Sequence, residues 1–470
     1  MKKQFRKLSK LPWSKICLIS LVAIFFSFSI ILTYDSGHYL SYVSIFEGNS
    51  PASNWDIVRG PVFPGIIQLS NLLFGKTSTG ILICTFLFYL SFVVICCILS
   101  KKISKNYQHH KLINTLVLIY LILNPLIFGY FHVLLTEFVA ITVTMLNILL
   151  AYKWIFVDLK NKKSLVLYSL YFIFTTIFCW HLKQPYIIIA IAPAIIACII
   201  SIVENHQKFN LLYRLGTIIF SLGFLILSIL SWNIILDSMH VDKNTGRDSS
   251  SSLSKQLITT YQITDESDNH FSAFITEFTK NPGKIIGTYF NNYCSLISLC
   301  KVSSTNSVDY ISTGELDLLE TYENTAIGYA TFNRNKNLFQ MSDEMQYRAS
   351  SYATDVSRNI FRPFFKVLSY PTNIIYKLVL LLLIPVTIFL IVIKFKTKDK
   401  KHQHLFYLSI ILLSTASFHL IFSAVALVID RYAIEAFIPA CLGIFGTITY
   451  AKLTLKNKPT LKSKHKRANA

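Results

Sequence analysis

The sequence predicts an all-α membrane protein that crosses the bilayer many times. Of its 470 residues, 53% are hydrophobic and only 15% are charged, and the mean hydropathy is +0.49. Soluble domains carry about 25% charged residues. Charge-poor stretches of about 20 residues, the length that a helix needs to cross a bilayer, recur along the chain. Together these observations exclude an assembly of soluble domains.

Ten such stretches predict about ten transmembrane helices. They lie near residues 16–34, 79–100, 112–129, 133–152, 164–182, 185–203, 215–236, 373–393, 405–429 and 433–451.

The distribution of charge predicts on which side of the membrane each loop lies. With the N-terminus in the cytoplasm, 28 of the 45 Lys and Arg residues fall in inner segments, whereas 21 of the 24 Asp and Glu residues fall in outer ones. This asymmetry follows the positive-inside rule and places both termini in the cytoplasm. The formal charge of +21 therefore reflects topology and anionic inner-leaflet lipid, and no nucleic-acid partner is needed. We expect a multi-pass protein of the cell membrane.

The predicted spans divide the chain into four parts. These are an N-terminal transmembrane module over 1–236 that includes a first outer loop at 35–76, a large extracytoplasmic loop at 237–372, C-terminal transmembrane helices at 373–451 and a basic cytoplasmic tail at 452–470. The sequence contains neither a Gly-rich ATP-binding motif nor zinc-ligand spacing. We therefore expect no cofactor and no metal.

Both outer loops contain apolar segments that are too short to cross the membrane. In the first loop, residues 61–74 are predicted either to lie at the interface or to re-enter the membrane. In the large loop, apolar residues recur at helical spacing over 271–278, 285–293 and 361–368, and Asn281-Pro282-Gly283 separates the first two segments. These segments are either helices that rest on the membrane or parts of a small folded cap over the bundle.

Six charged residues lie within or at the ends of the predicted spans, where charge is costly and often functional. They are Asp35, Glu137, Lys183, Asp430, Arg431 and Glu435. In the predicted topology all six lie at the outer ends of helices. A spread of charges through the membrane depth would favour an ion pathway, whereas this clustering predicts a polar site at the outer, extracytoplasmic surface.

Two of the acids are candidate catalytic groups. Asp35 begins the first outer loop, where a carboxylate can act as general base on an acceptor hydroxyl; the alternative is a polar residue that ends a helix at the water interface. Glu137 should face the bundle interior and either pair with a cation or hold a second proton; the alternative is a side chain that snorkels to water. For His132 and His181, ordinary interfacial roles are favoured.

Three cations are predicted to meet at the level of the outer headgroups. Lys183 lies in the turn after the fifth span, Arg431 in the turn before the last span, and Arg59 in the first outer loop. Cations at this level suit a phosphate group. The alternatives are headgroup contact for Lys183 and an ion pair with Asp430 or Glu435 for Arg431.

Several short motifs follow one another in a particular order along the chain. They are Asp35, Arg59-Gly60-Pro61-Val62-Phe63-Pro64, Glu137, Lys183-Gln184-Pro185, Asn281-Pro282-Gly283 and Arg431-Tyr432. This order resembles that of the C-type, lipid-sugar-dependent glycosyltransferases. The branch it resembles most comprises the protein O-mannosyltransferases and the lipid A aminoarabinose transferases, often described as family 39-like.

The resemblance implies inverting transfer of a hexosyl or pentosyl group from a polyprenyl-phosphate carrier. Asp35 would activate the acceptor hydroxyl, and Arg59, Lys183, Arg431 and Tyr432 would bind the donor and its phosphate. The acceptor would be an extracytoplasmic protein, glycolipid or polysaccharide, recognised by the large outer loop. Membrane lipid would be a further partner.

One departure from the family pattern concerns the acids. Many relatives carry adjacent paired acids in the first loop, whereas here Ser36 follows Asp35, so a second acid would be Glu47, Asp56 or Glu137.

Two other functions are compatible with the sequence. One is an O-antigen-type ligase or polymerase, whose chemistry would depend on residues of the large loop such as Arg348, Arg358 or Arg362. The other is a lipid or solute transporter, a class that usually has broken helices and polar groups near mid-membrane.

Overall fold

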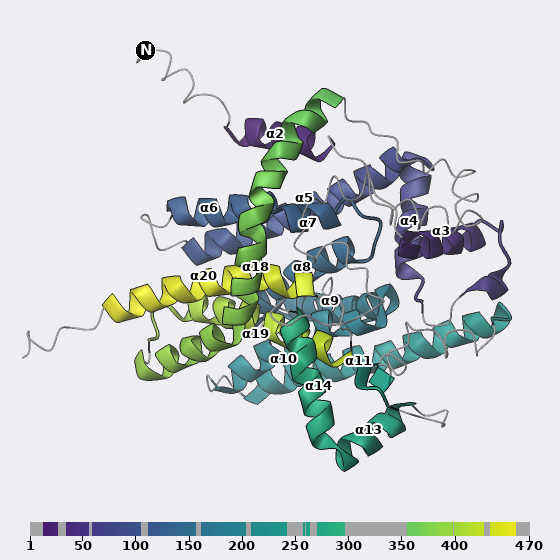
Figure 1. Cartoon of the computed structure of the whole chain (residues 1–470). Helices are drawn as coiled ribbons and strands as arrows, with labels where there is room; N and C mark the ends of the chain where they lie inside the picture. Colours follow the sequence, from purple (N-terminus) through teal and green to yellow (C-terminus); the bar gives the residue numbers. More distant parts are fainter. Residues whose placement is uncertain are drawn as a thin grey trace, which may run out of the picture.

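The structure is a computed structural model that describes most of the chain as helices joined by turns (Figure 1). The described residues are 13–26, 34–55, 59–104, 111–156, 161–203, 208–241, 257–258, 260–263, 270–296, 355–397, 399–426 and 433–456.

The helices follow one another along the chain with short connections in the N-terminal half. Those before the large loop are α2 (Trp13–Phe25), α3 (Tyr34–Phe46), α4 (Val62–Phe74), α5 (Ser78–Ser104), α6 (Lys111–Ile122), α7 (Pro125–Tyr130), α8 (Glu137–Ile155), α9 (Lys162–Leu182), α10 (Ile187–Val203) and α11 (Lys208–Ser238). Two short 3-10 helices, η1 (Ala52–Asn54) and η2 (Gln184–Tyr186), interrupt this series. The later helices are α13 (His270–Lys280), α14 (Pro282–Leu296), α18 (Asp355–Thr397), α19 (Gln403–Ala426) and α20 (Ile434–Lys456).

Among the described residues, seven helical segments are long and apolar enough to cross a membrane. They are Thr79–Ser104, Glu137–Ile155, Lys162–Leu182, Leu212–Ser238, Ile374–Thr397, Gln403–Val425 and Ile434–Leu455. The prediction of an all-helical, multi-pass membrane fold is confirmed for the described part of the chain. The count of ten spans and the cytoplasmic termini stay predictions.

The predicted span at 112–129 is not one continuous helix, because the helix breaks before Pro125. Proline has no backbone N–H and opposes helical geometry in the residue before it, so α6 ends at Ile122 and α7 begins at Pro125. The side-chain oxygen of Asn124 accepts a hydrogen bond from the backbone N–H of Ile127 at 3.2 Å, which caps α7. With 12 residues, α6 is about 18 Å long, shorter than the hydrocarbon core of about 30 Å.

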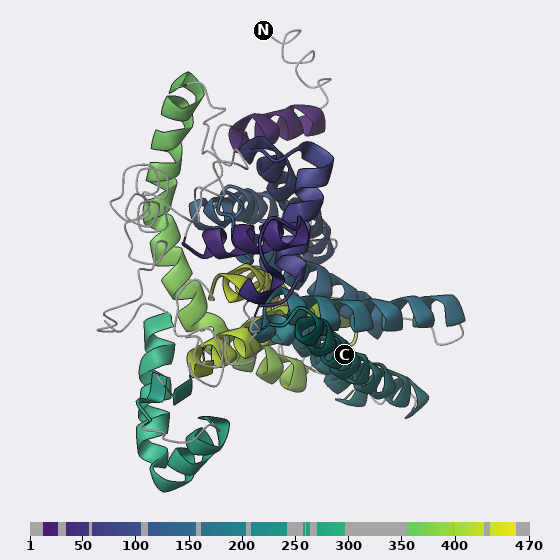
Figure 2. The ribbon, with the colours of Figure 1, turned by 90° about the vertical axis from the view of Figure 1, so that its right-hand side faces the viewer.

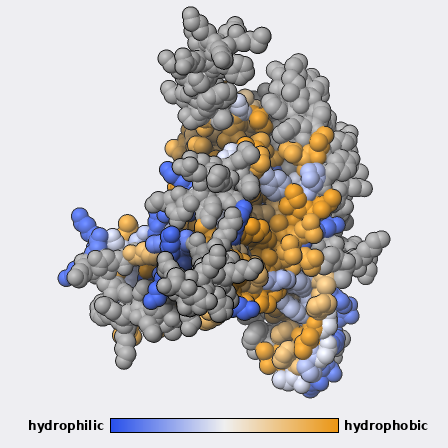
Figure 3. All heavy atoms as spheres, turned by 90° about the vertical axis from the view of Figure 1, so that its left-hand side faces the viewer, coloured by the Kyte–Doolittle hydropathy of each residue, from blue (hydrophilic) through white to orange (hydrophobic). Residues whose placement is uncertain are grey.

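The core of the bundle is formed around α8, which is buried along almost its whole length. It packs against α5, α10, α19 and α20, and α19 and α20 pack side by side. By contrast, α11 lies at the periphery and contacts α9 and α10. Its exposed apolar side chains, such as Ile219, Phe220 and Ile234, are suited to contact lipid. Figure 3 shows hydrophobic residues in a broad patch on one face of the molecule, with hydrophilic residues to its left and at its lower edge.

A buried arginine ties α11 to the end of α8. The guanidinium Nη2 of Arg214 donates to the carbonyl oxygens of Trp154 and Ile155, each at 2.9 Å, and the guanidinium lies 5.5 Å from the Trp154 ring. These carbonyls belong to the last turn of α8, where the helix supplies no i+4 backbone N–H; the Trp154 carbonyl also accepts from the backbone N–H of Phe156. Arg214 therefore serves as a side-chain cap between two transmembrane helices.

Replacing Arg214 by Ala should destabilise the bundle by about 3 kcal/mol, because two buried carbonyl groups lose charge-assisted hydrogen bonds. The measurement is the thermal unfolding temperature of the protein in detergent. Lys162→Ala, which removes an exposed cation from the same end of the bundle, is the control and should leave the unfolding temperature within a degree or so. Equal effects of the two variants would show that the cap contributes nothing specific.

The first outer loop contains more helix than its polar start predicts. Residue 35 lies in the first turn of α3, and α4 covers most of 61–74. With 13 residues, α4 is about 20 Å long, which is too short to cross the membrane. The exposed side chains of Leu69, Leu72 and Leu73 on α4 favour the interfacial alternative.

The large outer loop forms the helical hairpin predicted on either side of Asn281-Pro282-Gly283. Helices α13 and α14 project beyond the main bundle at the bottom of both views (Figures 1 and 2). The Glu277 carboxylate accepts hydrogen bonds from the Asn281 amide at 3.1 Å and the Lys284 ammonium at 3.2 Å, and these two contacts lower the pKa of Glu277. Asn292 of α14 donates to the carbonyl of Ala424 in α19 at 3.3 Å, which attaches the hairpin to the bundle.

The segment at 361–368 is not a separate interfacial helix. It is the first part of α18, a helix of 43 residues that continues into the span Ile374–Thr397. Pro363 and Pro371 lie within this helix and do not end it.

Candidate functional site

Four segments that are far apart in the sequence meet where α8 and α20 begin and α9 ends. They are the start of α3, the segment at 59–60, the segment at 134–137 and the turn at 181–186. Each is joined to the next by a contact given below, so that the four form a closed ring. We call this arrangement the helix-end ring.

The first contact links α3 to the segment before α8. The Ser36 hydroxyl, next to Asp35 in the chain, is buried and donates to the carbonyl of Leu134 at 2.7 Å. Nearby, the His132 ring lies between Phe25 and Phe128, with ring centroids 4.2 Å and 4.5 Å away. Its two nitrogens lie 2.9 Å and 3.0 Å from the carbonyl oxygens of Phe128 and Phe25. His132 thus has a structural role that joins the end of α2 to the end of α7.

The second contact links α3 to the first outer loop. Nη1 of Arg59 donates to the Tyr39 hydroxyl at 2.9 Å, and the guanidinium lies 5.3 Å from the Tyr39 ring. Tyr39 follows Asp35 by one helical turn, so Arg59 is held beside the turn of α3 that contains Asp35. The Trp55 indole donates to the Arg59 carbonyl at 2.8 Å and stacks on Tyr42 of α3. These contacts fix both the backbone and the side chain of Arg59.

The third contact brings the first outer loop against the end of α9. A Cβ atom added to Gly60 would lie 2.0 Å from the carbonyl oxygen of His181, so the two backbones touch. His181 is itself held by a contact of 2.8 Å between its Nε2 and the Ser228 hydroxyl of α11. Two residues further on, Lys183 caps the end of α9 in an extended conformation. Arg59 and Lys183 are therefore held at the same end of the bundle by one backbone contact.

The fourth contact closes the ring. The Lys183 ammonium lies 6.0 Å from the centre of the Tyr186 ring, and the Tyr186 hydroxyl lies 3.4 Å from the Thr136 hydroxyl. Thr136 donates to the carboxylate of Glu137 at 3.3 Å. Tyr186, Thr136 and Glu137 are all buried, so this contact lies in the interior of the protein. The buried position of Glu137 fits the predicted interior orientation and excludes a side chain that snorkels to water.

Beneath the ring, a second buried acid lies close to Glu137. Glu435, the second residue of α20, is almost fully buried and interacts electrostatically with Glu137. Its Oε2 lies 3.6 Å from Nε2 of His419 in α19. Two neighbouring buried carboxyl groups repel each other when both are ionised, and a histidine or a shared proton offsets that repulsion. His419 is therefore a partner for Glu435 other than the predicted Arg431.

The other predicted site residues are placed as follows. The backbone of Asp35 is described in α3, but its side chain, like Asp56, Asp430, Arg431 and Tyr432, lies outside the described part of the structure. Arg348 lies outside it too, and Arg358 and Arg362 are described by their α18 backbone alone. Of the possible second acids, Glu47 lies at the far end of α3 in an ion pair with Lys76 at 2.7 Å. Glu137 is thus the described acid that belongs to the ring.

Sequence reasoning missed the aromatic and hydroxyl residues that hold the ring together. Tyr39 follows Asp35 by one helical turn, which is a signal that could have been used. Tyr186 and Thr136 adjoin predicted residues but gave no signal of their own. His419, a histidine within an apolar span, could have been singled out as a partner for an intramembrane acid.

The ring combines cationic side chains with a nearby acidic position at the ends of membrane-spanning helices. Arg59 and Lys183 offer several N–H donors of the kind that bind phosphate oxygens. Within the described residues, no three His, Cys, Asp or Glu side chains are grouped to hold a metal ion. The arrangement is suited to an amphiphile whose anionic headgroup lies at the membrane surface while its chain stays in lipid.

Comparison with known proteins gives matches to solved structures. No protein-family model and no curated protein matches the sequence. The comparison of structures matches this chain to two crystal structures of ArnT from Cupriavidus metallidurans, one in the apo state and one bound to undecaprenyl phosphate. The first is 10% identical with a TM-score of 0.34 and the second 9% identical with a TM-score of 0.33, and each match covers 94% of this chain and 78% of the solved chain.

Proposed function

We propose that this protein transfers a sugar from a polyprenyl-phosphate carrier to an acceptor hydroxyl on the extracytoplasmic side of the membrane, with inversion at the anomeric carbon. The observation that carries this proposal is the helix-end ring. Its contacts support this proposal: Arg59 bonds to Tyr39, one turn from Asp35 on α3, and Gly60 lies against His181, two residues before Lys183. A polyprenyl phosphate presents its charge at headgroup level, which is where helix ends and loops supply polar groups.

The reaction requires a base and a site for the leaving group. Asp35 accepts the proton of the acceptor hydroxyl, whose oxygen then attacks the anomeric carbon of the sugar. The bond between that carbon and the phosphate oxygen breaks, and its electron pair leaves with the polyprenyl phosphate. Arg59, Lys183, Arg431 and Tyr432 stabilise the negative charge that develops on the phosphate. A single displacement of this kind inverts the anomeric configuration.

We assign Glu137 the role of a positioning residue. Its buried carboxylate accepts a hydrogen bond from the Thr136 hydroxyl, and Thr136 in turn contacts Tyr186, whose ring lies 6.0 Å from the Lys183 ammonium. Glu137 thereby holds the turn at 181–186 against the start of α8. Recognition of the acceptor, whether protein, glycolipid or polysaccharide, is assigned to the large outer loop.

Binding and turnover by the purified protein in nanodiscs test this function. Undecaprenyl phosphate should bind at least about tenfold more tightly than undecaprenol, because the alcohol lacks the charge that the cations recognise. With undecaprenyl-phosphate-linked hexoses and pentoses and an envelope extract as acceptor pool, one donor should release undecaprenyl phosphate and give an inverted product. Equal affinity for the phosphate and the alcohol would contradict a phosphate site. Movement of the intact donor across a vesicle membrane, with no product, would support a transporter instead.

Gly60→Ala should lower transfer by about 10²-fold, because a Cβ atom cannot fit 2.0 Å from the His181 carbonyl and Arg59 must move away from Lys183. The measurement is the initial rate of undecaprenyl phosphate release. Gly65→Ala is a matched control, since a Cβ atom at Gly65 would meet no atom within 4 Å. If both variants keep the wild-type rate, close packing of the loop on α9 is not needed for activity.

A further inference from the structure

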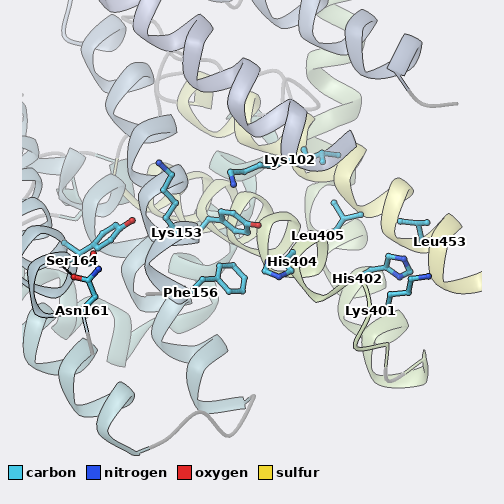
Figure 4. A pocket seen from close by; sticks show the side chains of 13 residues that line it. Lys102, Lys153, Phe156, Asn161, Ser164, Lys401, His402, His404, Leu405 and Leu453 are labelled. Carbon is cyan, nitrogen blue, oxygen red and sulfur yellow. Dashed lines mark hydrogen bonds between the residues drawn. The ribbon is translucent and has the colours of Figure 1, made fainter. Parts of the chain in front are cut away.

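At the end of the bundle opposite the helix-end ring, a cavity of about 630 Å³ opens between five helices. It lies among the ends of α5, α8 and α20 and the first turns of α9 and α19. Figure 4 shows Asn161 and Ser164 at one end, Lys401 and His402 at the other, and Lys102 between them. The charge distribution along the sequence predicts that this end faces the cytoplasm. We call this cavity the basic pocket.

The basic pocket has a strongly positive lining. Its thirteen lining residues, all within the described part of the chain, include three lysines, Lys102, Lys153 and Lys401, together with His402 and His404, and none of these thirteen is an acid. The nearest described acid along the chain is Asp399. Its carboxylate is already engaged by the His402 ring at 3.0 Å and by the backbone N–H groups of Lys401 and His402.

The helix dipoles offset the positive charge of two of these lysines but not that of the third. Lys102 and Lys153 lie in the last turns of α5 and α8, where a cation interacts favourably with the helix dipole. Lys401 instead precedes the first turn of α19, where the positive end of the dipole repels a cation. The first turn of α9 also faces the pocket, with Asn161 as its N-cap. Two helix starts and three lysines therefore surround one cavity, which is a favourable environment for an anion.

The interior of the basic pocket is aromatic and apolar. The Lys102 ammonium lies 5.1 Å from the centre of the Tyr152 ring, and the rings of Phe156 and His404 lie 4.3 Å apart. Leu405 and Leu453 complete the apolar wall. A cationic rim above an apolar wall at the end of membrane helices matches the two-part character of a phospholipid, with its anionic headgroup and its acyl chains.

We propose that the basic pocket binds a phosphate-bearing anion at the cytoplasmic membrane surface, through Lys102, Lys153 and Lys401. This site lies at the opposite end of the bundle from the helix-end ring and does not depend on the function proposed above. The phosphate belongs either to an anionic phospholipid headgroup or to a soluble phosphate ester.

Titration of the full-length protein in phosphatidylcholine nanodiscs with short-chain phosphatidylglycerol, followed by native mass spectrometry, tests this proposal. The double variant Lys153→Ala/Lys401→Ala should bind phosphatidylglycerol roughly 25-fold more weakly than wild type, about fivefold for each lysine. The matched control Lys163→Ala/Lys396→Ala removes two exposed lysines that do not line the pocket and should weaken binding about twofold or less. The variant Lys153→Arg/Lys401→Arg keeps both charges and should retain binding.

Parallel titrations with sn-glycerol 3-phosphate and inorganic phosphate distinguish the two sources of the anion. Binding of these soluble probes with the same dependence on Lys153 and Lys401 would indicate a phosphate ester of the cytoplasm. Binding of phosphatidylglycerol alone would indicate a lipid headgroup. If the two double alanine variants have the same affinity for every probe, or if the arginine variant binds as weakly as the alanine variant, the proposal is wrong.

Discussion

Asp35→Asn should abolish sugar transfer, lowering the turnover number by about 10²- to 10⁴-fold, because the amide cannot accept the proton of the acceptor hydroxyl. The side chains have nearly the same size, so the protein should still fold, insert and bind undecaprenyl phosphate with wild-type affinity. The measurements are the rate of undecaprenyl phosphate release from the donor and, separately, the affinity for undecaprenyl phosphate. A loss of turnover with retained affinity is the signature of a missing base.

Glu47→Gln is the matched control for Asp35. Glu47 is an acid at the other end of the same helix, where it pairs with Lys76 at 2.7 Å, and its replacement should leave turnover unchanged. Full activity of Asp35→Asn would remove the assigned base. If activity survived that change but was lost with Arg358→Ala or Arg362→Ala, an O-antigen-type ligase or polymerase would be the better assignment.

Arg59→Ala should lower transfer by about 10²- to 10³-fold, because the departing phosphate loses a fixed cation as its charge develops. The same variant should weaken the binding of undecaprenyl phosphate, in contrast to Asp35→Asn. Arg59→Lys should recover part of the lost activity, since a lysine keeps the charge but not the planar set of donors. The measurements are the turnover number, the KM for the donor and the affinity for undecaprenyl phosphate.

Tyr39→Phe tests whether the position of Arg59 matters as well as its charge. It removes the hydroxyl that accepts the Arg59 hydrogen bond but keeps the ring beside the guanidinium. We expect a fall of about tenfold or less in affinity for undecaprenyl phosphate. Lys280→Ala, an exposed cation at the end of α13, is the control for general electrostatic attraction and should have little effect. If Lys280→Ala and Arg59→Ala weaken binding equally, Arg59 has no specific phosphate contact.

Local sequence determined most of the helices. A run of about 20 apolar residues forms a helix in lipid because every backbone N–H and C=O must be satisfied within the segment. The spans that include α5, α8, α9 and α11 therefore appear where the sequence predicts them. The hairpin of α13 and α14 follows in the same way from helical spacing and the break at residues 281–283. The break in the span at 112–129 is also local, since Pro125 causes it, although the stretch was predicted as one helix.

Some residues of the candidate site could also be predicted from the sequence. Charged residues in lipid are costly, so Glu137, Lys183 and Glu435 could be singled out from their positions at helix ends alone. Their partners could not. The contacts that hold the ring join Ser36 to Leu134 and Thr136 to Tyr186, across 98 and 50 residues of sequence.

Only the tertiary structure decided which helix ends meet. Hydropathy is a property of one segment and its surroundings in the bilayer, whereas the contact of Gly60 with His181 depends on how α4, α9 and α11 pack together. The same holds for the basic pocket, where Lys153 and Lys401 come together because α8 and α19 are neighbours in the bundle. The sequence by itself determined most of the spans and the charged residues at their ends. Packing between distant segments decided which of those residues share a site, because lipid imposes no order on helices that it solvates equally well.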